Sequence, residues 1–306
     1  MEKIFTDFLK KESLLGKKLL LCVSGGVDSR VLLEIAVKSM DRKNLAVFHL
    51  DHALRSNSSK DFKFVKNLCK NNNINFFGET LKTTVQKNKE NYWREQRKNL
   101  SQKAAKEFGA TKILTAHHAT DFCETMIFRF TKGSGLSGLF PFDISTKPFW
   151  QIPKTEILKY AKEKKLSWRE DPSNKNVDFN RNLIRNKVLP KLRNITQNLE
   201  KVFLHESEIF KETQAFLDLS LIEKLNFDKS FDFSYGILDL NQFDNLPNIL
   251  QKEFLRKIAQ KTPSFSEVKD CLKWLKNNPK GNSKKEIGGR KVYLKKNILH
   301  WNGGIL

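Results

Sequence analysis

The chain has 306 residues, of which 39% are hydrophobic, and this is enough for one large domain or two modest ones. It has no apolar run of about 18 residues, no secretory signal and no C-x-x-C pair. These absences exclude a membrane span and a zinc ribbon and argue against a disulfide framework, so we expect a cytoplasmic protein. An excess of 56 basic over 34 acidic residues gives a net charge of +22, which favours a polyanionic partner such as nucleic acid, although a lysine-rich compositional bias is an alternative explanation.

Short apolar runs and helical stretches alternate along the first half of the chain. The expected strands are 17–23, 44–50, 74–79 and 111–117, and the expected helices are 28–40, 59–72, 88–108 and 119–130. This alternation predicts an α/β fold, a Rossmann-like doubly wound parallel sheet with helices on both faces. Ligands of such sheets bind beyond the carboxyl ends of the strands. The polar segments that follow the strands are therefore the first candidates for a functional site.

The segment Ser24–Ser29 (SGGVDS) joins the first expected strand to the next helix. Its glycines permit a sharp turn, and the N–H groups at a helix start can hold phosphate oxygens. The segment has neither the G-K-[ST] end of a Walker A loop nor a G-x-G-x-x-G fingerprint. An ordinary capped turn is the alternative interpretation. The full motif resembles the pyrophosphate-binding loop of the N-type ATP pyrophosphatases, the PP-loop superfamily.

Further motifs follow the other strands or lie on later helices. They are HLDHALR (49–55), NYWREQR (91–97), AHHATDFCET (116–125), WREDPSN (168–174) and RNLIRN (181–186). Asp121 and Glu124 are three residues apart and share one helix face. The HHxxD run has no histidine pair at i, i+4 spacing, which argues against a catalytic zinc site.

Several of these residues also have a structural interpretation. His49, His52 and His118 could cap strands or bind backbone, and Asp171–Asn174 would make a good turn. Asp121 and Glu124 could form a solvated helix face. Arg181 and Arg185 could contact RNA phosphate or close a hinge, and the sequence does not decide between these roles.

Taken together, the order and spacing of these motifs resemble those of the tRNA(Ile)-lysidine synthetases, from about residue 18 to 195. The resemblance implies an ATP-dependent carbon–nitrogen ligase. It would join free L-lysine to C2 of the cytidine at the first anticodon position of an isoleucine tRNA with a CAU anticodon. The tRNA would first be adenylated, and AMP and pyrophosphate would be released.

The resemblance also implies roles for individual residues. ATP would be bound by Ser24, Gly25, Gly26, Val27, Asp28 and Ser29. Asp28, Arg97 and His117 would act in catalysis, Asp28 as a ligand of Mg²⁺ and the other two near the adenylate. Asp121 and Glu124 would bind the ammonium group of lysine, for which paired carboxylates are a natural receptor. Thr120 and Phe122 depart from the pattern, because many members of the family have Asp and Gln there.

We predict a catalytic domain at 1–197 and a mainly helical, tRNA-contacting domain at 198–306 that ends in a basic β-hairpin. Residues 1–195 carry 38 basic and 20 acidic residues, and residues 270–306 carry 9 and 2, which would suit two contact zones on one long anion. The shortness of the second part resembles the shorter members of the family. The sequence leaves the oligomeric state open, with a homodimer among the alternatives.

Two other functions are alternatives to lysine ligation. A tRNA thiolase on the same fold is the closest alternative, but such enzymes generally rely on paired cysteines, which Cys22, Cys69, Cys123 and Cys271 do not form in sequence. A catalytically inactive RNA-binding module is the other, and the intact Ser24–Ser29 loop argues against it. Relatives that make small metabolites would have little use for so large a positive charge.

Overall fold

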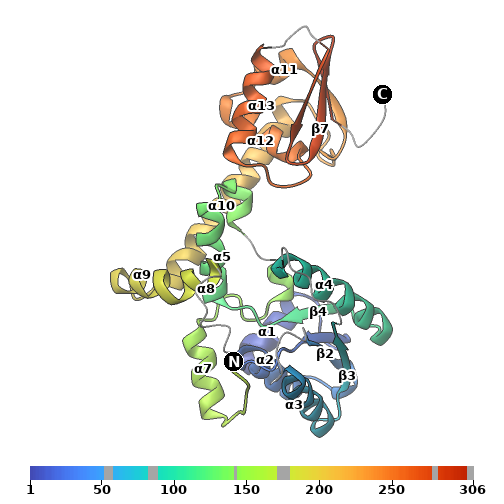
Figure 1. The fold of residues 1–306 in the computed structure, drawn as a ribbon, viewed down its shortest axis with the longest axis vertical. Coiled ribbons are helices and arrows are strands. Elements are labelled where there is room, and N and C mark those ends of the chain that lie inside the picture. Colours follow the sequence, from blue (N-terminus) through green and yellow to red (C-terminus); the bar gives the residue numbers. More distant parts are fainter. Residues whose placement is uncertain (52–57, 82–88, 141–142, 171–179, 278–281, 302–306) are drawn as a thin grey trace. The chain divides into compact units, whose positions relative to one another are not determined.

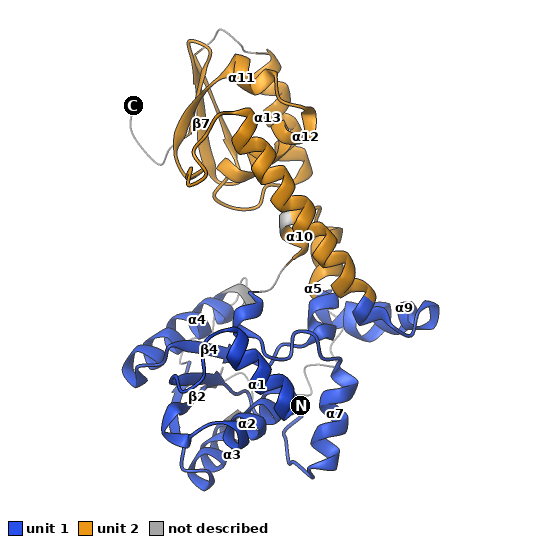
Figure 2. Cartoon of the chain, turned by 180° about the vertical axis from the view of Figure 1, so that it is seen from behind, with its two compact units in different colours: residues 1–124, 142–201 blue, residues 125–141, 202–306 orange. Residues whose placement is uncertain are grey.

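The computed structural model describes residues 1–51, 58–81, 89–140, 143–170, 180–277 and 282–301. They form two compact units, residues 1–124 with 142–201 and residues 125–141 with 202–306 (Figure 2). Within the described residues, no helix has the length and apolar character needed to cross a membrane.

Unit 1 is built on a parallel four-stranded sheet (Figure 1). Its strands are β1 (Leu19–Cys22), β2 (Leu45–Asp51), β3 (Asn75–Thr80) and β4 (Lys112–Thr115), in the order β3-β2-β1-β4. All three neighbouring pairs are parallel. This confirms the predicted α/β fold.

Alternate residues of the strands enter two separate cores, because successive side chains of a strand point to opposite faces. Leu19 and Leu21 pack with α1 (Glu2–Lys11), α2 (Val27–Ser39), α3 (Ser58–Asn71) and α7 (Lys154–Glu163). Leu20 packs on the opposite face against the C-terminal part of α4 (Lys89–Phe108). The strands are apolar throughout because both faces of the sheet are covered. A short 3₁₀ helix, η1 (Arg42–Asn44), leads into β2.

The strand order reverses beside β1. The chain runs from β1 outward to β2 and β3, and then returns to place β4 on the other side of β1. A doubly wound sheet binds its ligands at such a reversal, beyond the carboxyl ends of the strands. The two strand ends that meet there lead into Ser24–Ser29 and into α5 (Ala119–Thr131).

A chain segment after η2 (Ile144–Thr146) lies alongside the residues that follow β4. His118 and Phe149 form a parallel bridge, and the Ala119 amide donates to the Ile152 carbonyl at 3.0 Å. This pairing fixes the start of α7 near the end of β1. The remaining helical pieces of unit 1 are α8 (Asn180–Leu183), the π-helical turn η4 (Ile184–Val188) and α9 (Leu189–Ile195).

Unit 2 combines helices with a second, antiparallel sheet. Its strands are β5 (Gly236–Asp239), β6 (Ser283–Ile287), β7 (Arg290–Lys295) and β8 (Ile298–Trp301), in the order β5-β8-β7-β6. Its helices are α6 (Gly135–Leu139), α11 (Leu240–Asp244), α12 (Asn248–Ile258) and α13 (Phe265–Asn277), and the unit also holds most of α10 (Leu199–Lys224). The sequence indicated a hairpin near the end of the chain but carried no signal for β5.

Aromatic side chains form the centre of unit 2. Trp301 is fully buried and packs edge-on against Phe254 with ring centroids 5.1 Å apart, while its indole N–H donates to the Phe233 carbonyl.

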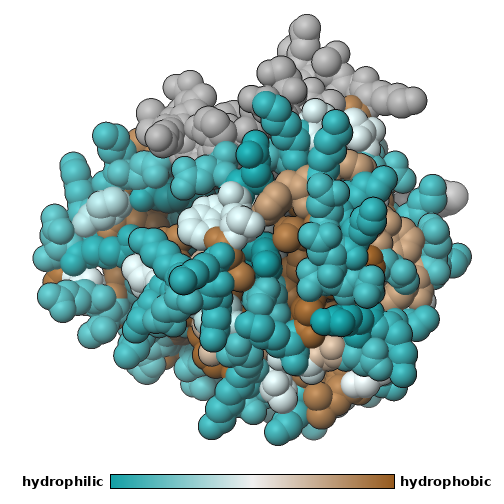
Figure 3. Space-filling model, turned by 90° about the horizontal axis from the view of Figure 1, so that it is seen from below, coloured by the Kyte–Doolittle hydropathy of each residue, from teal (hydrophilic) through white to brown (hydrophobic). Residues whose placement is uncertain are grey.

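The face of the molecule seen from below is mostly hydrophilic (Figure 3), and apolar surface shows only between its hydrophilic side chains.

Candidate functional site

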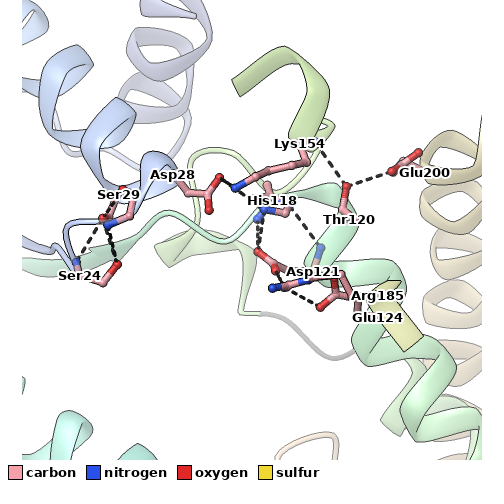
Figure 4. A network of polar contacts seen from close by, with 11 residues as sticks. Ser24, Asp28, Ser29, His118, Thr120, Asp121, Glu124, Lys154, Arg185 and Glu200 are labelled. Carbon is pink, nitrogen blue, oxygen red and sulfur yellow. Dashed lines mark hydrogen bonds and ion pairs between the residues drawn. The ribbon is translucent and has the colours of Figure 1, made fainter. Parts of the chain in front are cut away.

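The Ser24–Ser29 loop is held closed by its own hydroxyl groups (Figure 4). The Ser24 amide donates to Ser29 Oγ at 3.1 Å, and Ser29 Oγ donates to the Gly26 carbonyl at 3.0 Å. Gly25 has a φ of +90°, a left-handed conformation that a side chain would strain. The loop leads directly into the N-terminus of α2, where free N–H groups and the helix dipole favour an anion.

Arg169 binds the backbone of the Ser24–Ser29 loop. Its backbone N–H donates to the Gly25 carbonyl at 2.9 Å, and its Nε donates to Asp61 on α3 at 2.9 Å. The WREDPSN motif thus contacts the loop through its second residue. Its remainder, residues 171–174, lies outside the described residues, as does His52.

Asp28 lies in the first turn of α2 and is paired with a lysine from α7. Lys154 Nζ lies 2.5 Å from Asp28 Oδ1, and His118 Nε2 lies 3.6 Å from the same oxygen. Lys154 is distant in sequence, and the pairing of 147–153 with the residues after β4 brings it here. It was not among the residues predicted from the sequence.

His118 connects Asp28 to Asp121. The Asp121 N–H donates to His118 Nδ1 at 3.3 Å, so the neutral ring carries its proton on Nε2, which lies 3.4 Å from Asp121 Oδ2. Burial lowers the pKa of His118, although the two aspartates act in the opposite direction. The ring is therefore neutral at pH 7 and lies between the two carboxylates.

Asp121 and Glu124 share one face of α5, as their spacing predicted, and both contact Arg185. Arg185 Nε donates to Glu124 Oε1 at 2.5 Å, and Nη2 donates to Glu124 Oε2 at 2.8 Å and to Asp121 Oδ1 at 3.0 Å. The Glu124 side chain is 3% exposed. The pair is therefore not a solvated helix face, and Arg185 closes onto carboxylates.

The pKa values of the two carboxyl groups are shifted in opposite directions. Burial raises the pKa of Glu124 above its usual range, even though the hydrogen bonds from Arg185 act to lower it. Burial also acts to raise the pKa of Asp121, but His118, His117 and Arg185 outweigh it and hold this pKa below its usual range.

Thr120 lies at the centre of a second buried cluster. Its hydroxyl donates to Glu200 Oε1 at 2.9 Å and accepts from the Lys154 amide at 3.4 Å, while Arg193 also donates to Glu200. Phe122 is fully buried and lies near Trp150, with ring centroids 6.4 Å apart. Both residues that depart from the family pattern, Thr120 and Phe122, thus have structural contacts in this chain.

His117 and Arg97 lie on the exposed side of the same region. His117 Nδ1 is 2.8 Å from Thr115 Oγ1. Protein atoms crowded around the ring, with lesser effects of Lys147, His118 and Arg97, lower the pKa of His117 to about 4, although much of its surface is exposed. Its imidazole is therefore uncharged at pH 7. Arg97 is exposed on α4.

His49 has the structural role that the sequence left open. Its buried ring bonds through Nδ1 to the Val23 carbonyl at 2.8 Å, immediately before the Ser24–Ser29 loop. Among the described residues, no cluster of three or more acidic, histidine or cysteine side chains could hold a metal ion by itself. Mg²⁺ at an ATP site commonly takes one or two carboxylates together with phosphate oxygens, so a metal ion there would not require such a cluster.

Comparison with known proteins places this chain in a family. A family model described as a PP-loop domain matches residues 1–192. A tRNA(Ile)-lysidine synthase from Persephonella marina is 32% identical over 75% of this chain. Another, from Chlorobaculum tepidum, is 28% identical over 98% of this chain. The resemblance to the lysidine synthetases that the motifs indicated is confirmed.

The relatives differ in length. This chain spans 57% of the Persephonella protein, 66% of a Bacillus licheniformis tRNA(Ile)-lysidine synthase and 96% of the Chlorobaculum protein. Among solved structures, a U34-tRNA thiolase from Methanococcus maripaludis aligns with a TM-score of 0.57 over 69% of this chain and 77% of its own. The two are 14% identical, so this likeness concerns the fold.

Proposed function

The chain belongs to the PP-loop family, and we propose that it joins lysine to C2 of the cytidine at the first anticodon position of an isoleucine tRNA. The name shared by its relatives supports this activity. The observation that carries the proposal is the polar network at the carboxyl ends of β1 and β4. It connects the Ser24–Ser29 loop through Asp28 and His118 to the acidic pair Asp121 and Glu124 (Figure 4).

In the first half-reaction, the C2 oxygen of the cytidine attacks the α-phosphorus of ATP, and pyrophosphate leaves. The Ser24–Ser29 loop and the N-terminus of α2 would hold the pyrophosphate portion through N–H and hydroxyl donors. Lys154 supplies a positive charge 2.5 Å from Asp28 and would also face the phosphates. Arg97 and His117 would contact the adenylate.

A bound Mg²⁺ would neutralise phosphate charge in this step, and Asp28 would be its protein ligand. Asp28 fits this role because it begins a helix directly beside the loop. Lys154 now pairs with Asp28 and would turn towards phosphate oxygens when the metal binds.

In the second half-reaction, the side-chain amine of lysine attacks C2, and AMP leaves with the former C2 oxygen. Asp121 and Glu124 would bind the ammonium form, which must give up a proton to solvent before the attack. Two carboxylates on one face of α5 suit a cationic group, because hydrogen bonds between charged groups are the stronger class.

The proposed tRNA substrate accounts for the charge of the chain. The net charge of +22 favours association with an RNA backbone. A thiolase activity has no support from the cysteines. All four are free, and Cys69, Cys123 and Cys271 are buried with raised pKa values, which disfavours the reactive thiolate.

Pyrophosphate release from labelled ATP tests the proposed order of steps. We expect release to require the CAU-anticodon tRNA, and we expect lysine to release AMP from the tRNA adenylate. Release that requires no tRNA would contradict the proposal, and AMP release that responds to a sulfur donor would favour the thiolase.

A further inference from the structure

Every oxygen of the acidic pair of α5 already accepts a hydrogen bond from the protein. Arg185 contacts both oxygens of Glu124 and Oδ1 of Asp121. The remaining oxygen, Asp121 Oδ2, accepts the His118 N–H at 3.1 Å and lies 3.4 Å from His118 Nε2. An ammonium group needs several acceptors at once, and it would find every one of these four oxygens engaged.

Arg185 also covers the pair from the solvent side. Its side chain is 38% exposed, whereas that of Glu124 is 3% exposed. A substrate amine that reaches Glu124 must therefore take the position of the guanidinium. Figure 4 shows Arg185 reaching back onto both carboxylates.

The Arg185 guanidinium provides the acidic pair with the same kind of partner as a substrate ammonium group. Both groups are cationic donors, and the planar fork of arginine suits paired carboxylate oxygens especially well. Burial acts to lower the pKa of Arg185, but Glu124, Asp121 and Asp28 outweigh it and raise this pKa. The acidic pair is therefore held in an ion pair by a permanent cation of the chain itself.

The backbone around Arg185 allows its side chain to move away from the two carboxylates. Arg185 belongs to the π-helical turn η4, and turns of this kind recur at functional sites. Ile184 and Leu189 are buried on either side and anchor the backbone. A rotation about the bonds of the arginine side chain can expose the carboxylates without disturbing that anchor.

We propose that Arg185 is a specificity-determining residue that fills the ammonium site of the amino-acid-free enzyme and competes with the incoming substrate amine. The inference rests on the proposed lysine-binding role of Asp121 and Glu124. A bare cation makes too few contacts to displace a bidentate guanidinium, whereas an amino acid that binds the enzyme elsewhere as well can do so. Arg185 thus weakens binding of every cation and thereby selects the one with additional contacts.

Lysine binding to Arg185→Met tests the proposal. Methionine keeps much of the length of the side chain and removes its charge, so we expect lysine to bind at least about tenfold more tightly than to the wild type, because one charged competitor is removed. The dissociation constant should be measured by calorimetry at alkaline pH, which keeps Glu124 ionised when its partner is removed. Lys187→Met removes an exposed charge from the same turn and should leave the constant unchanged.

Guanidinium ion provides a second measurement that does not require the methionine variant to fold well. Arg185→Ala leaves a space shaped for guanidinium, so guanidinium chloride should weaken lysine binding to this variant more than sodium chloride at equal ionic strength. In the wild type, where the space is filled, the two salts should differ little. Arg185→Lys should bind lysine with intermediate affinity, because it keeps the charge and loses the fork.

The outcomes separate the inference from the proposed function. Weaker or unchanged lysine binding in Arg185→Met, with weaker binding in Glu124→Gln, would overturn the competitor role and leave the lysine site standing. Lysine binding that is the same in Glu124→Gln and the wild type would remove the lysine site itself. Equal effects of the two salts on Arg185→Ala would also overturn the inference.

Discussion

The Asp28 carboxylate forms an ion pair with Lys154, and we propose that it also binds Mg²⁺. We expect Asp28→Asn to reduce tRNA-dependent pyrophosphate release by at least roughly ten- to hundredfold, since it removes a charged ligand. Binding of tRNA should stay near the wild-type level in a filter-binding assay. Asp7→Asn, an exposed change in α1, is the control. Substantial turnover by Asp28→Asn would refute the metal-binding role.

Glu124 should act in the second half-reaction and not in the first. Glu124→Gln keeps the shape and removes the charge, so we expect the Michaelis constant for lysine to rise roughly ten- to hundredfold while the tRNA adenylate still forms. The adenylate would accumulate or hydrolyse, which labelled ATP can detect. Glu163→Gln on the exposed side of α7 is the control. Equal loss of both half-reactions would mean that Glu124 shapes the ATP cleft instead.

His49 makes stability depend on pH. Burial lowers its pKa from the ordinary 6.5, so above pH 6.5 the ring is neutral in the folded and the unfolded chain, and its full contribution to stability is present. As the pH falls below 6.5, the unfolded chain takes up the proton first and the free energy of unfolding decreases. We expect urea unfolding to show a smaller decrease on acidification in His49→Gln. An identical pH dependence in the variant would exclude this origin.

Most of the site residues whose roles the sequence predicted closely follow a strand end, whereas the sequence missed Lys154 and left the role of Arg185 open. Ser24–Ser29 and Asp121 follow β1 and β4 directly, so alternation and strand order were enough to bring them to one edge. Lys154 and Arg185 reach the same edge from segments far along the chain, and only the packed structure sets those contacts. Local spacing carries no information about them.

Among the secondary-structure elements, the β6–β7 turn offers a matched pair of glycines. A Cβ on Gly288 would lie 2.2 Å from the Lys261 carbonyl oxygen, whereas the nearest atom to a Cβ on Gly289 is 3.7 Å away, and both residues have positive φ. Gly289→Ala should cost about 1–2 kcal/mol from backbone strain alone. Gly288→Ala should cost more, because the backbone must also move. Hydrogen exchange of the β6 and β7 amides would measure both, and equal destabilisation would contradict the expected clash.

The sequence predicts only part of the second sheet. β6 and β7 alternate on either side of the two glycines, which indicated a hairpin. β5 has four residues and follows a segment with several phenylalanines, so it carries too little periodicity to be recognised. Its pairing with β8 joins residues about sixty positions apart, which sequence spacing does not predict.

At the scale of the whole molecule, we expect positive charge to determine the affinity of the protein for tRNA. Removing the end of the chain would be a poor test, because Ile287, Val292 and Trp301 belong to the core of unit 2. Replacing the exposed Lys284, Lys291, Lys295 and Lys296 with glutamine removes charge and keeps the fold. We expect the log–log salt dependence of tRNA binding to flatten by roughly 0.7–0.9 for each phosphate that the variant no longer neutralises. An unchanged slope would mean that this sheet does not contact RNA.

The product of the complete reaction tests the proposed activity most directly. The protein would be incubated with unmodified isoleucine tRNA carrying a CAU anticodon, with ATP and with isotopically labelled lysine, and the tRNA would then be digested to nucleosides for mass analysis. We predict a cytidine that has gained one labelled lysine with the loss of one water, and we predict that leaving out ATP abolishes it. An unmodified cytidine, or a nucleoside that has gained sulfur when a sulfur donor is supplied, would contradict the proposed function.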